Sequence, residues 1–295
     1  MDKDTHLVSR RDALRLGGTM AAGLGSLLTL SACSPQASSV SATSATSADS
    51  ATSVTPAIPA NSVTSTSNAS EADQPLEPGY EPLADASYDA TGFVLLTDVV
   101  PDIIQEIRYF GTYNFVGDQI DGYQEPVALL CREAADALRH ASDTAVAQGY
   151  RLKVWDAYRP QRGVNHFERW AQDLEDTRMQ AYFYPDLDKS VLFDLGYIDH
   201  RSGHARGSAI DLTLFDMATG KEVDTGGPFD FFGDLSHPNY MNVTEDQYRM
   251  RMLLRDIMVD AGYLALETEW WHFRLVNEPY PDTYFDFPVC KNSVA

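Results

Sequence analysis

The sequence predicts an α+β fold for residues 81–295, with helices flanking a small antiparallel sheet. Three observations lead to this prediction. Helical periods and short β-type runs are both present, their order shows no regular βαβ alternation, and the last two β-type runs lie close enough in sequence to pair. All tryptophans fall in this region, and its length of about 210 residues suffices for one domain with a substantial core.

Three segments have the apolar period of helices. Residues 126–148 repeat apolar positions at helical spacing and are followed by Gly149, a typical stop signal. Residues 161–175 form the second expected helix. Residues 244–261 form the third, with Thr244 as its cap and Gly262 after its end. The face of the second helix that is expected to be apolar carries Val164, Phe167 and Leu174.

Four shorter segments are predicted to be strands. Residues 151–155 alternate and are expected to run into a turn at Pro160. Residues 208–214 follow a glycine-containing turn. Residues 263–266 and 270–276 are expected to pair with each other and complete the sheet.

Residues 1–32 have the features of an export signal. The apolar run from Leu16 to Leu30 is too short to span a bilayer and is typical of the middle of a signal peptide. The pair Arg10-Arg11 before it indicates the twin-arginine route, although Ala13 stands where an aromatic residue is usual, so the ordinary secretory route stays open. Residues 30–33 resemble the bacterial lipobox, which predicts lipidation of Cys33 rather than a soluble signal peptide with an incidental cysteine.

Residues 33–80 are dominated by Ser, Thr, Ala and Pro and have no apolar period. Such a segment cannot bury enough surface to offset its ordering entropy, so we expect a flexible tether. Together with the lipobox, it predicts a membrane-anchored lipoprotein on the extracytoplasmic side.

The net charge of −21 argues against nucleic acid and anionic membrane surfaces as binding partners. Beyond Cys33 only Cys131 and Cys290 remain, and a disulfide between them and two free thiols are both open. The sequence gives no indication of oligomeric state.

Two short segments concentrate the catalytic side-chain types. In residues 202–211, His204 and Asp211 flank a turn at Gly207, where the backbone can reverse and bring both side chains to one point. Residues 267–273 add Glu269 and His272. Two histidines and one carboxylate suffice for a catalytic zinc with a water in the fourth position, and a nearby glutamate can act as general base.

Each of these residues also has a purely structural interpretation. His204 alone is compatible with a turn histidine, and Asp211 with a buried, hydrogen-bonded aspartate. Glu269 and His272 could form the polar face of a sheet. Residues three apart on a regular strand also face opposite sides, so these two share a site only if the chain bends between them.

Taken together, the motifs resemble those of the D-alanyl-D-alanine dipeptidases, including the vancomycin-resistance type, from about residue 92 to residue 287. The family motif Ser-x-His-x-x-Gly-x-Ala-x-Asp is matched by residues 202–211, and Glu-x-x-His by residues 269–272. Residues 155–162, 229–233 and 107–109 also resemble family segments.

The resemblance implies the fold of the D,D-peptidases, which is similar to that of the hedgehog domain, and one zinc ion per chain. It implies that His204, Asp211 and His272 bind the zinc, that Glu269 is the catalytic base, and that Arg159 stabilises the oxyanion. A surface ion pair is the alternative for Arg159, although Pro160 after it favours a fixed position.

The resemblance also implies a substrate site. Asp230 and Tyr109 would bind the free ammonium of a dipeptide, and Ser202 would contact the substrate. Aromatic packing remains open for Tyr109, and a role in forming the turn for Ser202.

The expected function is zinc-dependent hydrolysis of D-alanyl-D-alanine to two D-alanines outside the cytoplasm. The alternatives are a zinc D,D-carboxypeptidase acting on peptidoglycan stems and a non-catalytic wall-binding domain. Glu269 and Arg159 argue against the last, since binding alone requires neither a base nor an oxyanion partner. Other candidate residues lack the motif spacing and are discounted: Glu267, His140, His166, His200 and His237.

Overall fold

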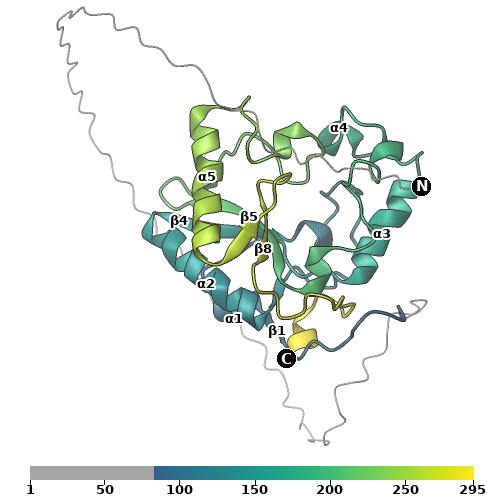
Figure 1. Ribbon diagram of the computed structural model, residues 1–295, viewed down its shortest axis with the longest axis horizontal. Coiled ribbons are helices and arrows are strands. Elements are labelled where there is room, and N and C mark those ends of the chain that lie inside the picture. Colours follow the sequence, from purple (N-terminus) through teal and green to yellow (C-terminus); the bar gives the residue numbers. More distant parts are fainter. Residues whose placement is uncertain (1–82) are drawn as a thin grey trace, which may run out of the picture. The chain divides into compact units, whose positions relative to one another are not determined.

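A six-stranded sheet forms the centre of the α+β fold in the computed structural model, which describes residues 83–295 (Figure 1). The predicted signal peptide 1–32, the tether 33–80 and Cys33 lie outside the described residues. Along the sheet the strands are β2 (Ile104–Gln105), β4 (Tyr150–Asp156), β5 (Ala209–Asp216), β8 (His272–Leu275) and β7 (Tyr263–Ala265), while β6 (Lys221–Glu222) pairs with the end of β5.

Most of the pairing in this sheet is antiparallel, as predicted. The exception is β2, which lies parallel to β4. A parallel neighbour needs a long crossover connection, and the chain between β2 and β4 supplies it. The central strand β5 is buried along residues 209–214, so its side chains contribute to the core on both faces.

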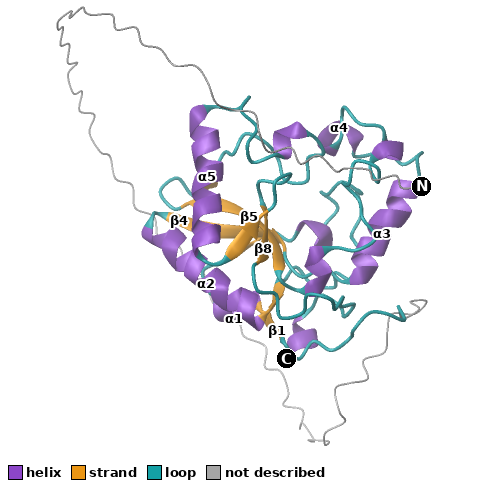
Figure 2. Cartoon of the chain, viewed as in Figure 1, coloured by secondary structure: helices purple, strands orange, loops and turns teal. Residues whose placement is uncertain are grey.

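The longer helices lie on either side of the sheet region in Figure 2. Helix α2 (Arg132–Ala147) packs against β4 and α5 (Glu245–Asp260), and α5 also packs against β7. Helix α3 (Gln161–Gln172) lies on the opposite side of the view. Two one-turn helices complete the set, α1 (Leu96–Val99) and α4 (Gln180–Phe183).

The predicted helix boundaries are confirmed where a local signal sets them. Thr244 caps α5 through a capping box with Gln247, in which each side chain accepts a hydrogen bond from the other residue's backbone N–H. Gly149 and Gly262, which follow α2 and α5, have φ angles of 89° and 94°. Glycine adopts this left-handed conformation without steric cost.

Two helix predictions were too long. Residues Leu129–Cys131 form strand β3, which pairs antiparallel with β1 (Phe93–Leu95), so α2 begins only at Arg132. The partner strand lies more than thirty residues earlier in the chain, and the local period carries no information about it. Helix α3 ends at Gln172, and Leu174 beyond it is 51% exposed, so the expectation that Leu174 shares the buried face was wrong.

The predicted pairing of the last two strands is confirmed, with Leu264 opposite Arg274. Strand β8 is shorter than expected, because Trp270 and Trp271 lie in a turn before it. Both described cysteines are free: Cys131 is buried beside Ser208, and Cys290 lies beside Ser293. No helix in residues 83–295 has both the length and the apolar character needed to cross a bilayer.

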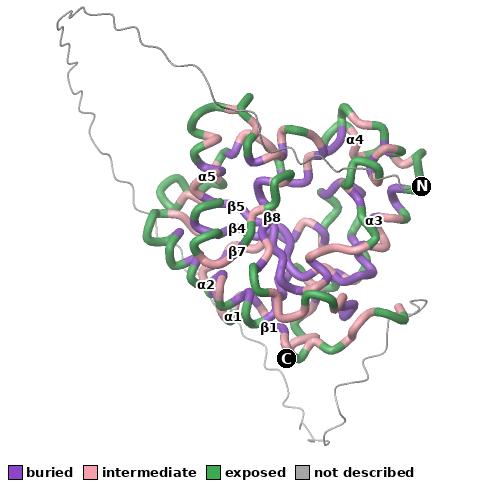
Figure 3. Tube along the Cα trace, viewed as in Figure 1, coloured by how far each residue is buried: buried purple, intermediate pink, exposed green. Residues whose placement is uncertain are grey.

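The buried residues gather at the centre of the domain (Figure 3). Beside α3, an aromatic cluster extends this core. The ring of Phe115 lies 4.7 Å from that of Phe167, 5.1 Å from Trp170 and 5.1 Å from Phe232. These rings form a rigid wall beside the pocket described below.

Candidate active site

The central strands place two of the three expected metal ligands side by side. Asp211 on β5 and His272 on β8 are direct cross-strand partners. His204 lies in the 3₁₀ turn Gly203–Arg206 just before β5, and Gly207 then reverses the chain with φ 77°. A Cβ at Gly207 would lie 2.2 Å from the ring of Phe93, so the predicted need for glycine in this turn is confirmed by both conformation and space.

The ligand atoms of these three residues form a small triangle. His204 Nε2 lies 3.1 Å from His272 Nδ1 and 3.3 Å from Asp211 Oδ2, and His272 Nδ1 lies 3.0 Å from Asp211 Oδ1. A tetrahedral zinc with bonds near 2.0 Å has ligand–ligand separations of about 3.3 Å. The donor set and its spacing therefore fit a zinc ion. No other group of three potential ligands is found together in the described part of the chain.

Two further features set the orientation of His204 and the ionisation of Asp211. His204 Nδ1 donates to the carbonyl of Ala157 at 2.7 Å, which leaves the lone pair of Nε2 directed at the cluster. Burial by itself raises the pKa of Asp211, but the imidazoles of His204 and His272 outweigh it and lower that pKa. Asp211 is therefore ionised, as a metal ligand must be.

Glu269 reaches the cluster from the turn that precedes β8. Because β8 begins at His272, the two residues do not share a regular strand, and the predicted bend between them is present. Glu269 Oε2 lies 3.9 Å from His272 Nδ1. Burial raises the pKa of the Glu269 carboxyl, which brings it closer to the range of a group that accepts and returns a proton near neutral pH.

Arg159 lies on the other side of the cluster, in a fixed position. Its guanidinium packs against the rings of both Tyr109 and Phe167, 4.8 and 4.9 Å from their centroids. Its Nη2 lies 3.8 Å from Asp211 Oδ2. The side chain is 11% exposed, so the alternative of a surface ion pair was wrong.

Asp156 is a buried carboxylate to which sequence reasoning assigned no role. Its Oδ2 accepts from Nε and Nη2 of Arg159 at 3.0 and 2.9 Å and lies 3.4 Å from His204 Nδ1. Its Oδ1 accepts from the hydroxyl of Tyr123 at 2.5 Å. The sequence signal that could have identified Asp156 was its position three residues before Arg159, in a segment that resembles the family. Asp156 thus fixes Arg159 relative to the cluster.

Asp230 and Tyr109 meet as the resemblance implied. The Tyr109 hydroxyl donates to Asp230 Oδ2 at 2.8 Å, and both residues are buried. Asp230 is the only non-glycine residue with positive φ in the described chain, at 61°. Burial, followed by the nearby Asp211 charge, raises the pKa of Asp230 well above its usual range. Tyr109 also packs against Phe115 and Phe167, so its aromatic packing and its hydroxyl contact coexist.

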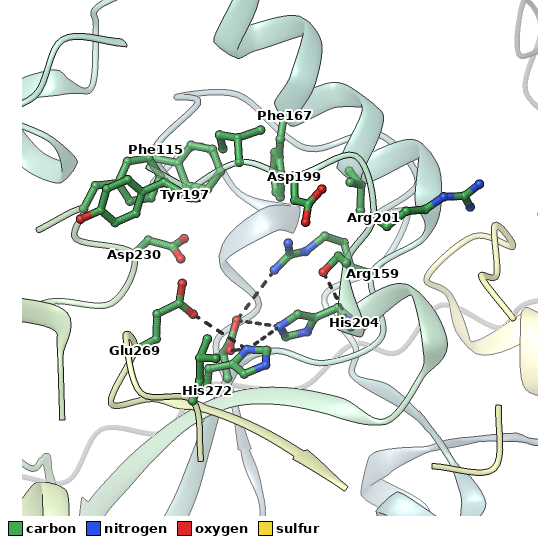
Figure 4. Close-up of a pocket in the computed structure, with 18 of the residues that line it drawn as sticks. Phe115, Arg159, Phe167, Tyr197, Asp199, Arg201, His204, Asp230, Glu269 and His272 are labelled. Atoms are coloured by element: carbon green, nitrogen blue, oxygen red, sulfur yellow. Dashed lines mark hydrogen bonds and ion pairs between the residues drawn. The ribbon is translucent and has the colours of Figure 1, made fainter. Parts of the chain in front are cut away.

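These groups surround one pocket of about 240 Å³ (Figure 4). Asp230 and Glu269 face it from one side, and His204 and His272 lie beneath it. Ser202 also lines the pocket, and its Oγ accepts the backbone N–H of His204 at 3.3 Å, so it lies at the site and shapes the turn as well. The loop 196–201 borders the pocket and was not predicted, because no local pattern marks loop residues that meet a site only in the folded chain.

The sequence profile of the peptidase family M15, D-ala-D-ala dipeptidase, matches residues 89–290. The chain belongs to this family. It is therefore a metallopeptidase by descent as well as by the composition of its site.

Two curated dipeptidases at about 40% identity support the assignment. The D-alanyl-D-alanine dipeptidase of Enterococcus faecium is 40% identical over 198 residues, 67% of this chain and 98% of that protein. The D-alanyl-D-alanine dipeptidase of Streptomyces coelicolor is 39% identical over 197 residues, again 67% and 98%. Among solved structures, the vancomycin resistance D,D-pentapeptidase VanY, in complex with Zn(II), is 14% identical with a TM-score of 0.32, and the match covers 54% of this chain and 78% of that one.

Proposed function

We propose that this peptidase is a zinc-dependent dipeptidase that hydrolyses D-alanyl-D-alanine to two D-alanines outside the cytoplasm. One observation carries the proposal: a small pocket joins the His204–Asp211–His272 cluster to the buried carboxylate of Asp230. The cluster fits one zinc ion per chain, and Asp230 fits the free ammonium of a short substrate.

The residues divide the chemistry between them. A zinc ion bound by the cluster would polarise the scissile carbonyl and lower the pKa of a water molecule. Glu269 takes the proton from the attacking water and returns it to the leaving amine. The guanidinium of Arg159 stabilises the negative charge that develops on the carbonyl oxygen. Losing one such donor typically costs about a hundredfold or more in rate.

The size and charge of the pocket favour a dipeptide over a peptidoglycan stem. Its volume of about 240 Å³ is below the roughly 300–1,000 Å³ of pockets that bind drug-sized ligands. Asp230 is 7% exposed and forms no ion pair with a described residue, so a substrate ammonium would supply its missing partner. A longer stem has no ammonium at that position, and binding it would leave the carboxylate unpaired. The relatives named D-alanyl-D-alanine dipeptidase support the same substrate.

The proposed location depends on the first 80 residues. An export signal, a lipobox at Cys33 and a tether of nearly fifty residues are not needed by a cytoplasmic enzyme. A coil of that length has a root-mean-square span of about 35–40 Å, enough to hold the domain away from a bilayer. We therefore propose a diacylglycerol anchor on Cys33 and a substrate pool outside the cytoplasm.

Release of free D-alanine from three substrates tests the activity: D-alanyl-D-alanine, its N-acetylated form and a pentapeptide stem. We expect the dipeptide to be cleaved with a kcat/KM at least about thirtyfold higher, because leaving a buried charge unpaired costs about 2–5 kcal/mol. Equal cleavage of the pentapeptide would establish the carboxypeptidase instead.

Metal analysis tests the cofactor. Purified protein should contain one zinc per chain and the His272→Ala variant much less, because two ligands hold zinc more weakly than three. His237→Ala provides a matched control, since His237 lies outside the cluster. Equal zinc in all three proteins would overturn the ligand assignment.

Palmitate labelling tests the anchor. Wild-type protein should be labelled and should fractionate with membranes, whereas Cys33→Ala should be unlabelled. Unlabelled wild-type protein in the cytosolic fraction would contradict the proposed location while leaving the proposed chemistry intact.

A further inference from the structure

Arg251 on α5 is a buried cation outside the pocket. Its side chain is 1% exposed, and among residues 83–295 no carboxylate forms an ion pair with it. Burial lowers the pKa of its guanidinium, with no neighbouring charge opposing the effect. A buried charge without a counter-charge destabilises a fold unless its hydrogen bonds compensate, so the contacts of Arg251 indicate what it does.

Arg251 hydrogen-bonds to the two ends of one segment. Its Nε donates to the carbonyl of Thr225 at 2.6 Å, and its Nη1 donates to the carbonyl of His237 at 2.9 Å. The segment between these carbonyls, residues 225–237, carries Asp230 near its middle. We call it the Asp230 loop. One planar guanidinium therefore fixes both ends of the loop whose carboxylate faces the pocket.

The Asp230 loop has little regular structure to hold it. Its only helical turn is the 3₁₀ turn Asp234–Ser236, and Asp230 itself has the unfavourable φ of 61°. Such a conformation persists only where the surroundings impose it. Gly227 allows Leu235 to pack closely within the loop, because a Cβ at residue 227 would lie 2.9 Å from Leu235 Cγ.

The same arginine lies beside the turn that carries Glu269. Its Cζ is 5.6 Å from the ring centroid of Trp270, the residue that follows Glu269. The backbone N–H of Trp270 donates to the carbonyl of Ser236 in the Asp230 loop at 2.9 Å. The loop and the turn are therefore joined directly, with Arg251 packed against both.

We infer that Arg251 is a positioning residue for substrate recognition: it fixes the Asp230 loop so that the Asp230 carboxylate meets the ammonium of the dipeptide. This inference rests on the proposed role of Asp230. Arg251 does not line the pocket, so it acts on the substrate only through the loop. Asp230 contacts the ammonium in the ground state and in the transition state alike, so loss of its position should affect binding rather than the chemical step.

Steady-state kinetics on D-alanyl-D-alanine test the inference with the variants Arg251→Met and Arg251→Lys. Arg251→Met should raise KM about tenfold or more, since a displacement of about 1 Å at a substrate contact has effects of this order. Its kcat should stay within about twofold of the wild type, and its zinc content should be unchanged. Arg251→Lys keeps the charge but not the planar fork. Arg251→Lys should raise KM by a smaller factor. If Arg251→Met does not fold, the KM of Arg251→Lys still tests the inference.

Lys189→Met is the matched control. Lys189 is equally buried, donates to the carbonyls of Asp173 and Asp176, and lies 3.9 Å from the ring centroid of Trp170. Its removal should lower the melting temperature as much as Arg251→Met does, with no change in KM. An equal rise in KM for both variants would show a general loss of packing and would overturn the inference.

A double-mutant cycle with Asp230→Asn separates this inference from the proposed function. If Arg251 acts through Asp230, the double variant should have a KM well below the product of the two single effects. Full multiplication of the two effects, or an unchanged KM in Arg251→Met, would overturn the positioning role while leaving the dipeptidase intact. An unchanged KM in Asp230→Asn would refute the proposed ammonium site, and the inference with it.

Discussion

The two ends of the pocket are built in different ways. At the end proposed to bind zinc, here called the metal end, Asp211 and His272 are cross-strand partners on central strands, and His204 lies in a tight turn at the start of one of them. At the end proposed to bind the substrate ammonium, here called the ammonium end, Asp230 lies in a loop of residues 225–237 and its partner Tyr109 comes from a distant 3₁₀ turn. The metal end takes its geometry from strand pairing, whereas the ammonium end depends on side chains that hold loops.

This difference indicates which properties of the enzyme substitutions at each end of the pocket should alter. Strand pairing holds the backbone of paired residues at fixed separations. This suits a metal ion, whose bonds to its ligands vary little in length. Loops accept insertions and substitutions more readily. We therefore expect variants at the metal end to abolish activity and variants at the ammonium end to alter substrate preference.

Glu269→Gln should cause the largest loss. We expect kcat to fall by about 10²–10⁴-fold, because glutamine cannot accept the proton of the attacking water. Zinc content should stay at the wild-type level, since Glu269 is not a proposed ligand. Turnover measurements and metal analysis on the same preparation check both points.

Glu267→Gln is the control for this variant. Glu267 is exposed, lies two residues away and does not line the active-site pocket. Its turnover should match the wild type. A greater loss in Glu267→Gln than in Glu269→Gln would reverse the assignment of the base.

Asp230→Asn should raise KM about thirtyfold or more, because a buried charge that pairs with a substrate charge contributes about 2 kcal/mol or more. kcat should change much less. A rise in KM with little change in kcat distinguishes the ammonium end from the metal end, and a loss of kcat with an unchanged KM would contradict this distinction.

The raised pKa of Asp230 adds a pH dependence. Below that pKa the carboxyl is protonated and has no charge for the ammonium. KM should therefore rise as the pH falls toward the acid range and should level off as the pH rises above the pKa of Asp230. Asp230→Asn should remove this component of the KM profile. An identical profile in both proteins would exclude Asp230 as its source.

Asp156→Asn should lower kcat about tenfold by loosening Arg159, whose guanidinium would lose a charged partner. Tyr123→Phe removes only one hydrogen bond to the same carboxylate and should have a smaller effect. Rates measured at saturating substrate check the order of the two. A larger effect of Tyr123→Phe would mean that Asp156 is not the residue that holds Arg159 in position.

Thr244→Ala should affect stability alone. Loss of the helix cap destabilises by about 1 kcal/mol, which corresponds to a melting temperature about 2–4 °C lower for a domain of this size. Thr244→Ser keeps the hydroxyl and should retain most of the stability. Neither variant should alter kcat or KM, because α5 contributes no residue to the pocket.

Features with a local signal could be predicted from the sequence alone. The resemblance of residues 202–211 and 269–272 to family motifs identified the residues of the metal cluster and the adjacent glutamate, although each residue taken alone also had a structural interpretation. Capping and stop signals set the ends of α5 and the end of α2, since a cap involves residues at most four positions apart.

Features that depend on partners far apart in the chain could be seen only in the folded protein. Strand β3 forms because β1 lies beside it, although its own residues continue a helical period. Asp156 matters because folding places it between Arg159 and His204, and Arg251 matters because folding brings it within hydrogen-bonding distance of both ends of the Asp230 loop. Long-range packing leaves no periodic trace in the sequence, since the contacting residues lie tens of positions apart and only the folded chain brings them together.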